Sequence, residues 1–292
     1  MVDEDAIRFR VSFSAALGFE GSHASTGGID VDGNGDFFGT TVDPYRHRVD
    51  VNVFNLTPHL IYPLTDTMNL EIGLPLRRID RTASVIAASD TETEDLKEMQ
   101  RHVDLHHATE TLNGVGDLSL WLRPRLPGNS WSWGMTLPTG STEEDPYVLG
   151  KQDLAHEHIQ FGTGTVVPRL QYLHSAEDWI AMTTLSAPFY ANSHGFRAPP
   201  ELGFYAARRG PVAESWAWSF GFSARLQGYG DWNGIRDENT GYGALVADGG
   251  LTWTGSAGRF IFGVTYPLVQ EVWDDSGDAF ELGPTFAVSF VP

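Results

Sequence analysis

The sequence predicts an all-β fold, a transmembrane antiparallel up-and-down β-barrel of about twelve strands. Apolar and polar residues alternate along many segments, and the connections between those segments are alternately short and long. No apolar run approaches the roughly 18 residues that a transmembrane helix needs. Because lipid-facing apolar and inward-facing polar residues average out along a barrel strand, the mean hydropathy of -0.22 is compatible with a membrane protein.

Alternation at a period of two gives a strand one apolar and one polar face. In the clearest example, 214–229, Trp216, Trp218 and Phe220 share one face, and Ser219 and Ser223 share the other. The final segment ends in alternating aromatic residues, which is typical of the last strand of outer-membrane proteins. We predict strands at 6–19, 47–62, 67–79, 115–126, 130–138, 159–174, 178–190, 200–208, 214–229, 241–255, 258–270 and 279–291.

The connections separate this fold from a soluble β-sandwich or a lipocalin-like protein, whose strands also alternate. Every second connection is short, and two of the others, about 20–46 and 80–114, are very long. Short periplasmic turns opposite long extracellular loops are typical of a bacterial outer-membrane barrel, and an even strand number leaves both chain ends on the periplasmic side. The short connections are 63–66, 127–129, 175–177, 209–213 and 256–257.

Composition is compatible with an envelope protein and excludes one class of partner. The formal net charge is -19, which makes nucleic acid an unsuitable ligand, and the absence of cysteine excludes a disulfide framework. The first five residues are too polar for a signal peptide, which we expect to have been removed. We therefore expect a single domain, 1–292, in the bacterial outer membrane, in contact with its lipid and lipopolysaccharide.

The interior of the predicted barrel is polar. A barrel in lipid cannot leave a strand edge exposed, so the strands must close. Twelve strands lie between eight, whose side chains fill the interior, and sixteen, which enclose a wide aqueous channel, so we expect a narrow lumen. For each charged residue inside, a structural salt bridge is favoured over a substrate contact, while the group indicates a hydrated interior or a constriction. Alternation places these residues inside: Arg8, Arg10, Asp50, Glu71, Asp117, Arg123, Arg125, Arg169, Glu201 and Arg225.

Three segments carry a family resemblance. The segment 114–126, GVGDLSLWLRPRL, resembles the G-x-GD-L-x-L-x-x-RYRL element of the meta-pathway phenol-degradation outer-membrane transporters. LPTGS at 137–141 is similar to the LPTG segment of that family, and GTGT at 162–165 is similar again. The resemblance covers about 114–172, and elsewhere it is limited to the strand rhythm. It implies a barrel that passes small, often aromatic or hydrophobic, molecules.

The first long loop contains a candidate calcium site. Asp30, Asp32, Asn34 and Asp36 stand at alternate positions, as in the first half of a calcium-binding loop. The twelfth position is Thr41 instead of the bidentate glutamate that largely sets affinity. An acidic external loop is therefore the favoured interpretation, and a weak calcium site is the alternative. No other cofactor is predicted.

Two histidine clusters in the long loops are candidate transition-metal ligands. His102, His106 and His107 precede the fourth predicted strand, and His156 and His158 precede the sixth, so both clusters lie at the same end of the barrel. Imidazoles bind zinc or copper, and a short helix over 90–107 would place His102 and His106 on one face. Solvated loop histidines are the favoured interpretation.

No catalytic set is predicted, so we do not expect an enzyme. Ser193 and His194 are adjacent, whereas nucleophilic hydrolysis needs serine, histidine and an orienting group that converge in space. A polar turn is favoured there. The leading functional hypothesis is a passive outer-membrane channel or transporter for small molecules. The alternative is a non-conducting barrel whose acidic and histidine-containing loops bind metal ions or an envelope protein partner.

Overall fold

The computed structural model describes residues 6–25, 29–31, 37–41, 45–125, 128–144, 160–274 and 278–292. Its large sheet contains fifteen strand segments. They are β1 (Arg8–Ser25), β4 (Tyr45–Thr65), β5 (Met68–Gly73), β6 (Leu76–Ile86), β7 (Glu110–Val115), β8 (Leu118–Pro124), β9 (Ser130–Leu137), β10 (Val167–Ser175), β11 (Trp179–Ser186), β13 (Glu201–Ala213), β14 (Trp216–Gln227), β17 (Tyr242–Gly255), β18 (Gly258–Val272), β19 (Asp278–Glu281) and β20 (Thr285–Val291).

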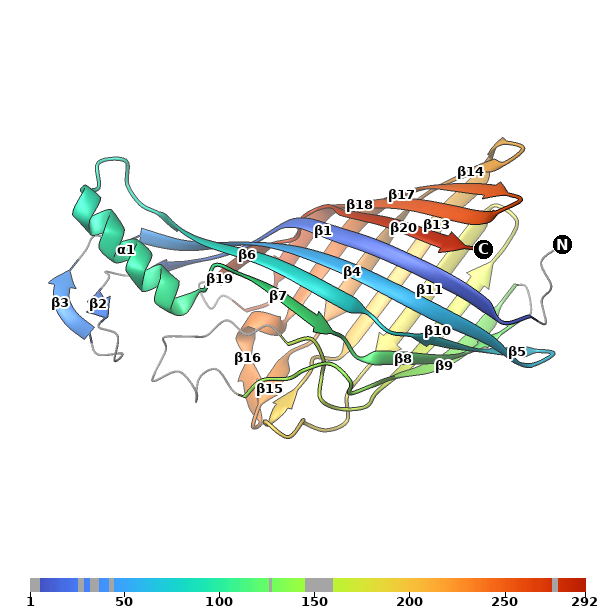
Figure 1. The fold of residues 1–292 in the computed structure, drawn as a ribbon, viewed down its shortest axis with the longest axis horizontal. Coiled ribbons are helices and arrows are strands. Elements are labelled where there is room, and N and C mark those ends of the chain that lie inside the picture. The colour runs from blue at the N-terminus through green and yellow to red at the C-terminus, as the bar shows by residue number, and fades with distance from the viewer. Residues whose placement is uncertain are drawn as a thin grey trace.

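These segments form a closed antiparallel barrel with twelve strand positions, which confirms the predicted fold class. Three positions hold two successive segments each: β5 with β6, β7 with β8, and β19 with β20. The barrel closes because β1 pairs with β4 on one edge and with β20 on the other. The start of β1 and the C-terminus lie at one end of the barrel, at the right of Figure 1, together with the short hairpin between β17 and β18.

The remaining elements belong to the long connections. They are β2 (Ile29–Val31), β3 (Phe37–Thr41), α1 (Thr93–His106), β12 (Phe196–Arg197), β15 (Gly230–Trp232), β16 (Ile235–Asp237) and the 3-10 helix η1 (Glu238–Thr240). β12, β15 and β16 form a small sheet of their own, and β2 pairs with β3. Within the described residues, no helix is both long enough and apolar enough to cross a membrane.

The outer face of the barrel is apolar where it would contact lipid. Cross-strand pairing aligns Phe13 of β1 with Val288 of β20, and Val288 with Phe262 of β18. These side chains point away from the interior and stay exposed, as expected for residues that lipid would cover. Other large exposed apolar residues of these faces are Phe9, Val11, Leu56, Trp133, Leu185, Phe204, Phe220, Phe222, Val264, Tyr266 and Phe286.

One side of the barrel extends well beyond the rest. β1, β4 and β6 continue as long ribbons toward the end that carries α1 (Figure 1). The outer face of this extension is polar: Arg48 and Asp50 of β4 form an ion pair there, and Arg78 and Asp80 of β6 form another. Since charged side chains that face hydrocarbon are costly, the extension would lie outside the bilayer.

Helix α1 covers the inner face of this extension. Met99 and Val103 of α1 are fully buried against Tyr45 and Val49 of β4 and Ala83 of β6. An apolar inner face over α1 is the reverse of the pattern in the bilayer, where the apolar face is external. The helix thus folds part of the predicted loop 80–114 into an ordered cover at the extracellular end.

The described strands differ from the predicted ones mainly near the long loops. The strand predicted at 159–174 begins only at Val167, because Gly164 has a φ of 68°, a left-handed conformation that interrupts an extended strand. The strand predicted at 178–190 ends at Ser186, two residues before Pro188, which has no amide proton for a sheet hydrogen bond. The strand predicted at 6–19 instead extends to Ser25, and it contains a bulge between Ala16 and Phe19.

Candidate functional site

The inner surface of the barrel has two unlike sides. One side, which we call the charged wall, carries Arg10 of β1, His59 of β4, Glu71 of β5, Arg123 of β8 and Gln171 of β10. The opposite side, which we call the small-residue wall, comes from β14, β17, β18, β20 and part of β1. Many of its inward residues have short side chains or none: Ser12, Ser14, Ser219, Gly221, Gly250, Gly263, Ala287 and Ser289.

Glu71 is the centre of the charged wall. Its side chain is 6% exposed, and it accepts hydrogen bonds from two guanidinium groups. Arg10 Nη2 lies 2.5 Å from Glu71 Oε1, and Arg123 Nε lies 2.9 Å from Oε2. His59 Nδ1 is 3.1 Å from Oε1, and Arg123 also donates to Gln171. One carboxylate therefore holds together side chains from three other strands.

Trp121 of β8 forms a platform beside this network. The Arg123 guanidinium carbon lies 4.6 Å from its ring centroid, and that of Arg169 lies 5.1 Å away. The indole rests on Gly134 of β9, where a Cβ atom would be 2.6 Å from the ring. The absence of a side chain at Gly134 therefore makes room for Trp121, which keeps the two arginines oriented along the inner surface.

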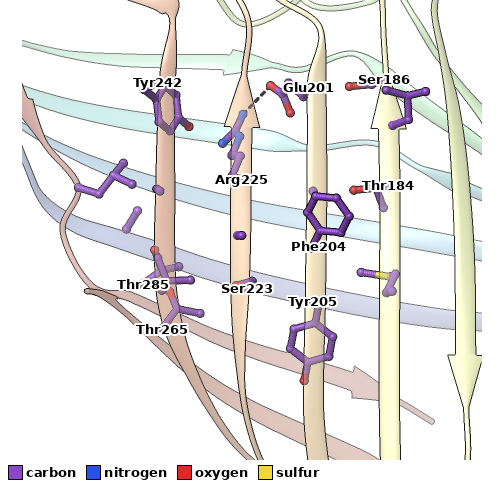
Figure 2. Close-up of a pocket in the computed structure, with 18 of the residues that line it drawn as sticks. Thr184, Ser186, Glu201, Phe204, Tyr205, Ser223, Arg225, Tyr242, Thr265 and Thr285 are labelled. Carbon is purple, nitrogen blue, oxygen red and sulfur yellow. Dashed lines mark hydrogen bonds and ion pairs between the residues drawn. The ribbon is translucent and has the colours of Figure 1, made fainter. Parts of the chain in front are cut away.

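A second ion pair separates the two walls. Arg225 of β14 donates to Glu201 of β13 at 2.5 Å, and Figure 2 shows this pair beside Tyr242 of β17. Tyr242 is buried, and its ring contacts Phe280, which in turn contacts Phe19 of β1. This group of aromatic rings lies at the end of β17 away from the β17–β18 hairpin, and Phe19 and Tyr242 line the lumen there.

A cavity of about 540 Å³ lies between these groups. Its size falls within the roughly 300–1,000 Å³ range of small-molecule sites in proteins. The lining is mixed: hydroxyl groups and small residues alternate with aromatic rings and two arginines (Figure 2). The inward residues that line it include Ala16, Phe19, Arg169, Met182, Thr184, Ser186, Glu201, Tyr205, Ser223, Arg225, Tyr242, Thr265 and Thr285.

A loop segment lies against the inner side of β6 and β7. Asp117, between β7 and β8, accepts hydrogen bonds from the backbone of Gly140 at 3.0 Å and of Thr163 at 2.8 Å, and from the Thr163 hydroxyl at 2.8 Å. Phe161 packs on Gly114, where a Cβ atom would lie 2.5 Å from the ring. The buried Phe161 therefore covers part of the lumen on the side of the charged wall.

The structure brings most of the predicted lumen residues to the interior. Arg10, Glu71 and Arg123 form one network, Glu201 and Arg225 form a second pair, and Arg169 lies between them. Three of the remaining four have separate places inside the barrel. Asp117 fixes the loop, Arg125 donates to Asn69 at 2.9 Å near the periplasmic turn, and Arg8 stands on the inner face of β1 at the same end.

Asp50 lies on the outer face of β4, so its predicted place in the lumen is wrong. It shares the face of Leu56, which is exposed on the outside of β4, and its partners Arg48 and Glu20 lie on that same outer face. The apolar residues Val49 and Val51 of β4 face inward instead, because this part of the strand lies beyond the apolar band and packs toward α1.

The side chains of Asp30, Asp32, Asn34, Asp36, His102, His106, His156 and His158 all lie outside the described residues. Among the side chains that are described, no group of three or more potential ligands could hold a metal ion. The calcium and transition-metal sites therefore stay predictions. Asn192 accepts the backbone N–H of His194 at 2.9 Å, so Ser193 and His194 form the predicted polar turn.

Several interior residues were not predicted from the sequence. Gln171 shares the inward face of β10 with the predicted Arg169, whereas His59 lies on the face of β4 opposite to Asp50. His107 was grouped with the loop histidines, yet it is buried, and its Nε2 lies 3.2 Å from His47 Nδ1 beneath α1. Strand alternation could have identified Gln171, but the predicted inward placement of Asp50 excluded His59. No local signal pointed to the His47–His107 contact, which joins residues 60 apart.

Comparison with known proteins supports the fold. No family model matches the sequence, and no curated protein matches it. An outer-membrane channel from Pseudomonas putida F1 is similar, with 15% identity, a TM-score of 0.54, and coverage of 100% of this chain and 99% of that one. The Pseudomonas putida toluene transporter TodX has 9% identity and a TM-score of 0.47, with 99% and 90% coverage. A Pseudomonas aeruginosa FadL homologue has 8% identity and a TM-score of 0.46, with 98% and 90% coverage. The first likeness, over both full lengths, is the one that supports the barrel architecture.

Proposed function

We propose that this protein is a bacterial outer-membrane channel for the passive movement of small molecules with apolar or aromatic parts. The observation that carries the proposal is the cavity of about 540 Å³ inside a closed barrel whose outer face is apolar. A mixed lining of hydroxyl groups and aromatic rings suits a solute that is neither fully polar nor fully apolar. The full-length fold likeness to an outer-membrane channel and the family resemblance of 114–172 give further support.

The two walls suggest how a solute would move. The small-residue wall leaves space along β17, β18 and β20, whereas the charged wall and Phe161 fill the opposite side. A solute would therefore travel along the small-residue wall and pass the polar groups without displacing the Glu71 network. The apolar outer band would contact lipid, and lipopolysaccharide would surround the polar extension of β1, β4 and β6.

Uptake measurements in outer-membrane vesicles test this function. Vesicles that contain the protein should take up phenol faster than vesicles without it, because the lipopolysaccharide leaflet slows apolar solutes. Gly263→Phe should reduce the rate several-fold, since Gly263 faces the lumen and has no neighbour within contact distance of an added Cβ atom except Ala287 at 3.8 Å and Gly249 O at 4.0 Å. Planar-bilayer conductance should fall in parallel.

A matched control uses the opposite face of the same strand pair. Gly249 pairs with Val264 on the lipid-facing side, so Gly249→Phe adds the same ring outside the barrel and should leave uptake unchanged. A sealed barrel in planar bilayers, together with phenol uptake equal to that of empty vesicles, would contradict the proposed function.

A further inference from the structure

Arg169 differs from the other central arginines of the lumen. Arg10 and Arg123 share Glu71, and Arg225 is paired with Glu201. Within the described residues, Arg169 makes neither a hydrogen bond nor an ion pair. Its guanidinium group lies over the face of the Trp121 ring. A guanidinium group has five N–H donors in a planar fork, and this one presents them to the cavity that it lines.

The local structure leaves space for an anion at this guanidinium. Arg169 of β10 stands across from Ser186 of β11, which contributes a hydroxyl group on the same inner face and lines the same cavity. The nearest carboxylate, Glu201, is already held by Arg225 at 2.5 Å. Two arginines and one carboxylate thus leave an uncompensated positive charge at this side of the cavity, in a protein whose formal net charge is -19.

The rest of the cavity suits an apolar body of ring size. Tyr242, Phe19 and Met182 offer aromatic and thioether surface, and Ala16 and Ala244 leave open space between them. A ligand with a negative group at one end and a ring at the other would therefore satisfy both parts of the lining. Arginine binds carboxylates in a bidentate manner, which favours a carboxylate over a spherical anion.

We infer that the cavity binds small monocarboxylates with an apolar ring, with Arg169 as the anchor for the carboxylate and Ser186 as a second donor. This inference deepens the proposed function and rests on it, because it names a class of solute that would lodge in the lumen. The carboxylate would accept two N–H donors of Arg169, and the ring would lie toward Tyr242 and Phe19.

Equilibrium dialysis of the purified protein in detergent micelles tests this site, with protein-free micelles as the blank. Radiolabelled benzoate is the probe, and benzyl alcohol and acetate are competitors that keep only the ring or only the carboxylate. Benzoate should bind, and both competitors should displace it poorly. Arg169→Gln should weaken benzoate binding by about tenfold or more, the loss expected for a charge-assisted hydrogen bond, and Arg169→Lys should restore part of it.

Arg209→Gln is the matched control. Arg209 lies on the inward face of β13 and donates to Ser175 and Ala176 O at the periplasmic turn, so its loss removes one lumen charge away from the cavity. It should bind benzoate as the parent protein does. Equal losses of benzoate affinity in Arg209→Gln and Arg169→Gln would overturn the inference in favour of a general charge effect. If acetate displaced benzoate as effectively as unlabelled benzoate does, the site would bind anions without regard to the ring, which would also overturn the inference. Absence of benzoate binding in a protein that still admits phenol would refute the carboxylate site and leave the proposed channel intact.

Discussion

The charged wall and the small-residue wall use the same strand alternation for opposite purposes. On the charged wall, Glu71 joins Arg10, His59 and Arg123 from three neighbouring strands, so these side chains fill interior volume and hold the wall together. On the small-residue wall, Gly263 and Ala287 face the same interior and leave it open. One side of a narrow barrel can therefore stabilise the fold while the opposite side leaves space for a solute.

The largest expected effect tests the charged wall. Glu71→Gln should lower the free energy of unfolding by about 3–5 kcal/mol, because the substitution leaves Arg10 and Arg123 without their shared buried carboxylate. Urea unfolding in detergent micelles, followed by tryptophan fluorescence, measures the change. The folded fraction can be followed by heat-modifiable gel migration. A loss below about 1 kcal/mol, the value of a solvated pair, would show that this wall is not a structural centre.

A smaller effect concerns the loop that lies against the charged side. Asp117→Ala removes an acceptor of three hydrogen bonds from Gly140 and Thr163, which should cost roughly 1.5–3 kcal/mol per bond to a charged group if the loop stayed fixed. We expect the loop to detach instead. The free energy of unfolding should then fall by less than the sum of the three bonds, and bilayer conductance should rise because Phe161 leaves Gly114. Glu144→Ala, which removes an exposed carboxylate from the same loop, is the control. Unchanged conductance in Asp117→Ala would exclude Phe161 from the constriction.

The sequence predicts the barrel more completely than it predicts this interior. Alternation identified Arg10, Glu71 and Arg123 as inward residues, because each lies inside the apolar outer band where period-two patterning has one meaning. It failed at Asp50, because beyond the bilayer the apolar face of β4 turns inward to pack against α1. Similarly, the contact between Asp117 and Thr163 joins residues 46 apart and leaves no local signal.

The comparison between walls can be sharpened with one methyl group on each. Gly134→Ala should destabilise the protein by about 1–3 kcal/mol, because the added Cβ would lie 2.6 Å from the Trp121 ring and 2.9 Å from Leu120 O. Gly263→Ala on the small-residue wall should be neutral or stabilise by up to about 1 kcal/mol, since its nearest neighbour is 3.8 Å away and alanine restricts the unfolded chain. Equal effects in urea unfolding would mean that the walls do not differ in packing.

The smallest expected effect compares two ion pairs of the same chemistry. Glu201 and Arg225 are 2.5 Å apart, as are Glu71 and Arg10, but the Glu201 side chain is 36% exposed and that of Glu71 is 6%. Water in the cavity should solvate Glu201 and Arg225, so Glu201→Gln should change the free energy of unfolding by only about 0–1 kcal/mol. The same urea measurement, run beside Glu71→Gln, decides whether exposure or position in the barrel sets the value of an ion pair. If Glu201→Gln were as damaging as Glu71→Gln, the cavity would behave as a dry interior, and the small-residue side would contribute to stability as much as the charged wall does.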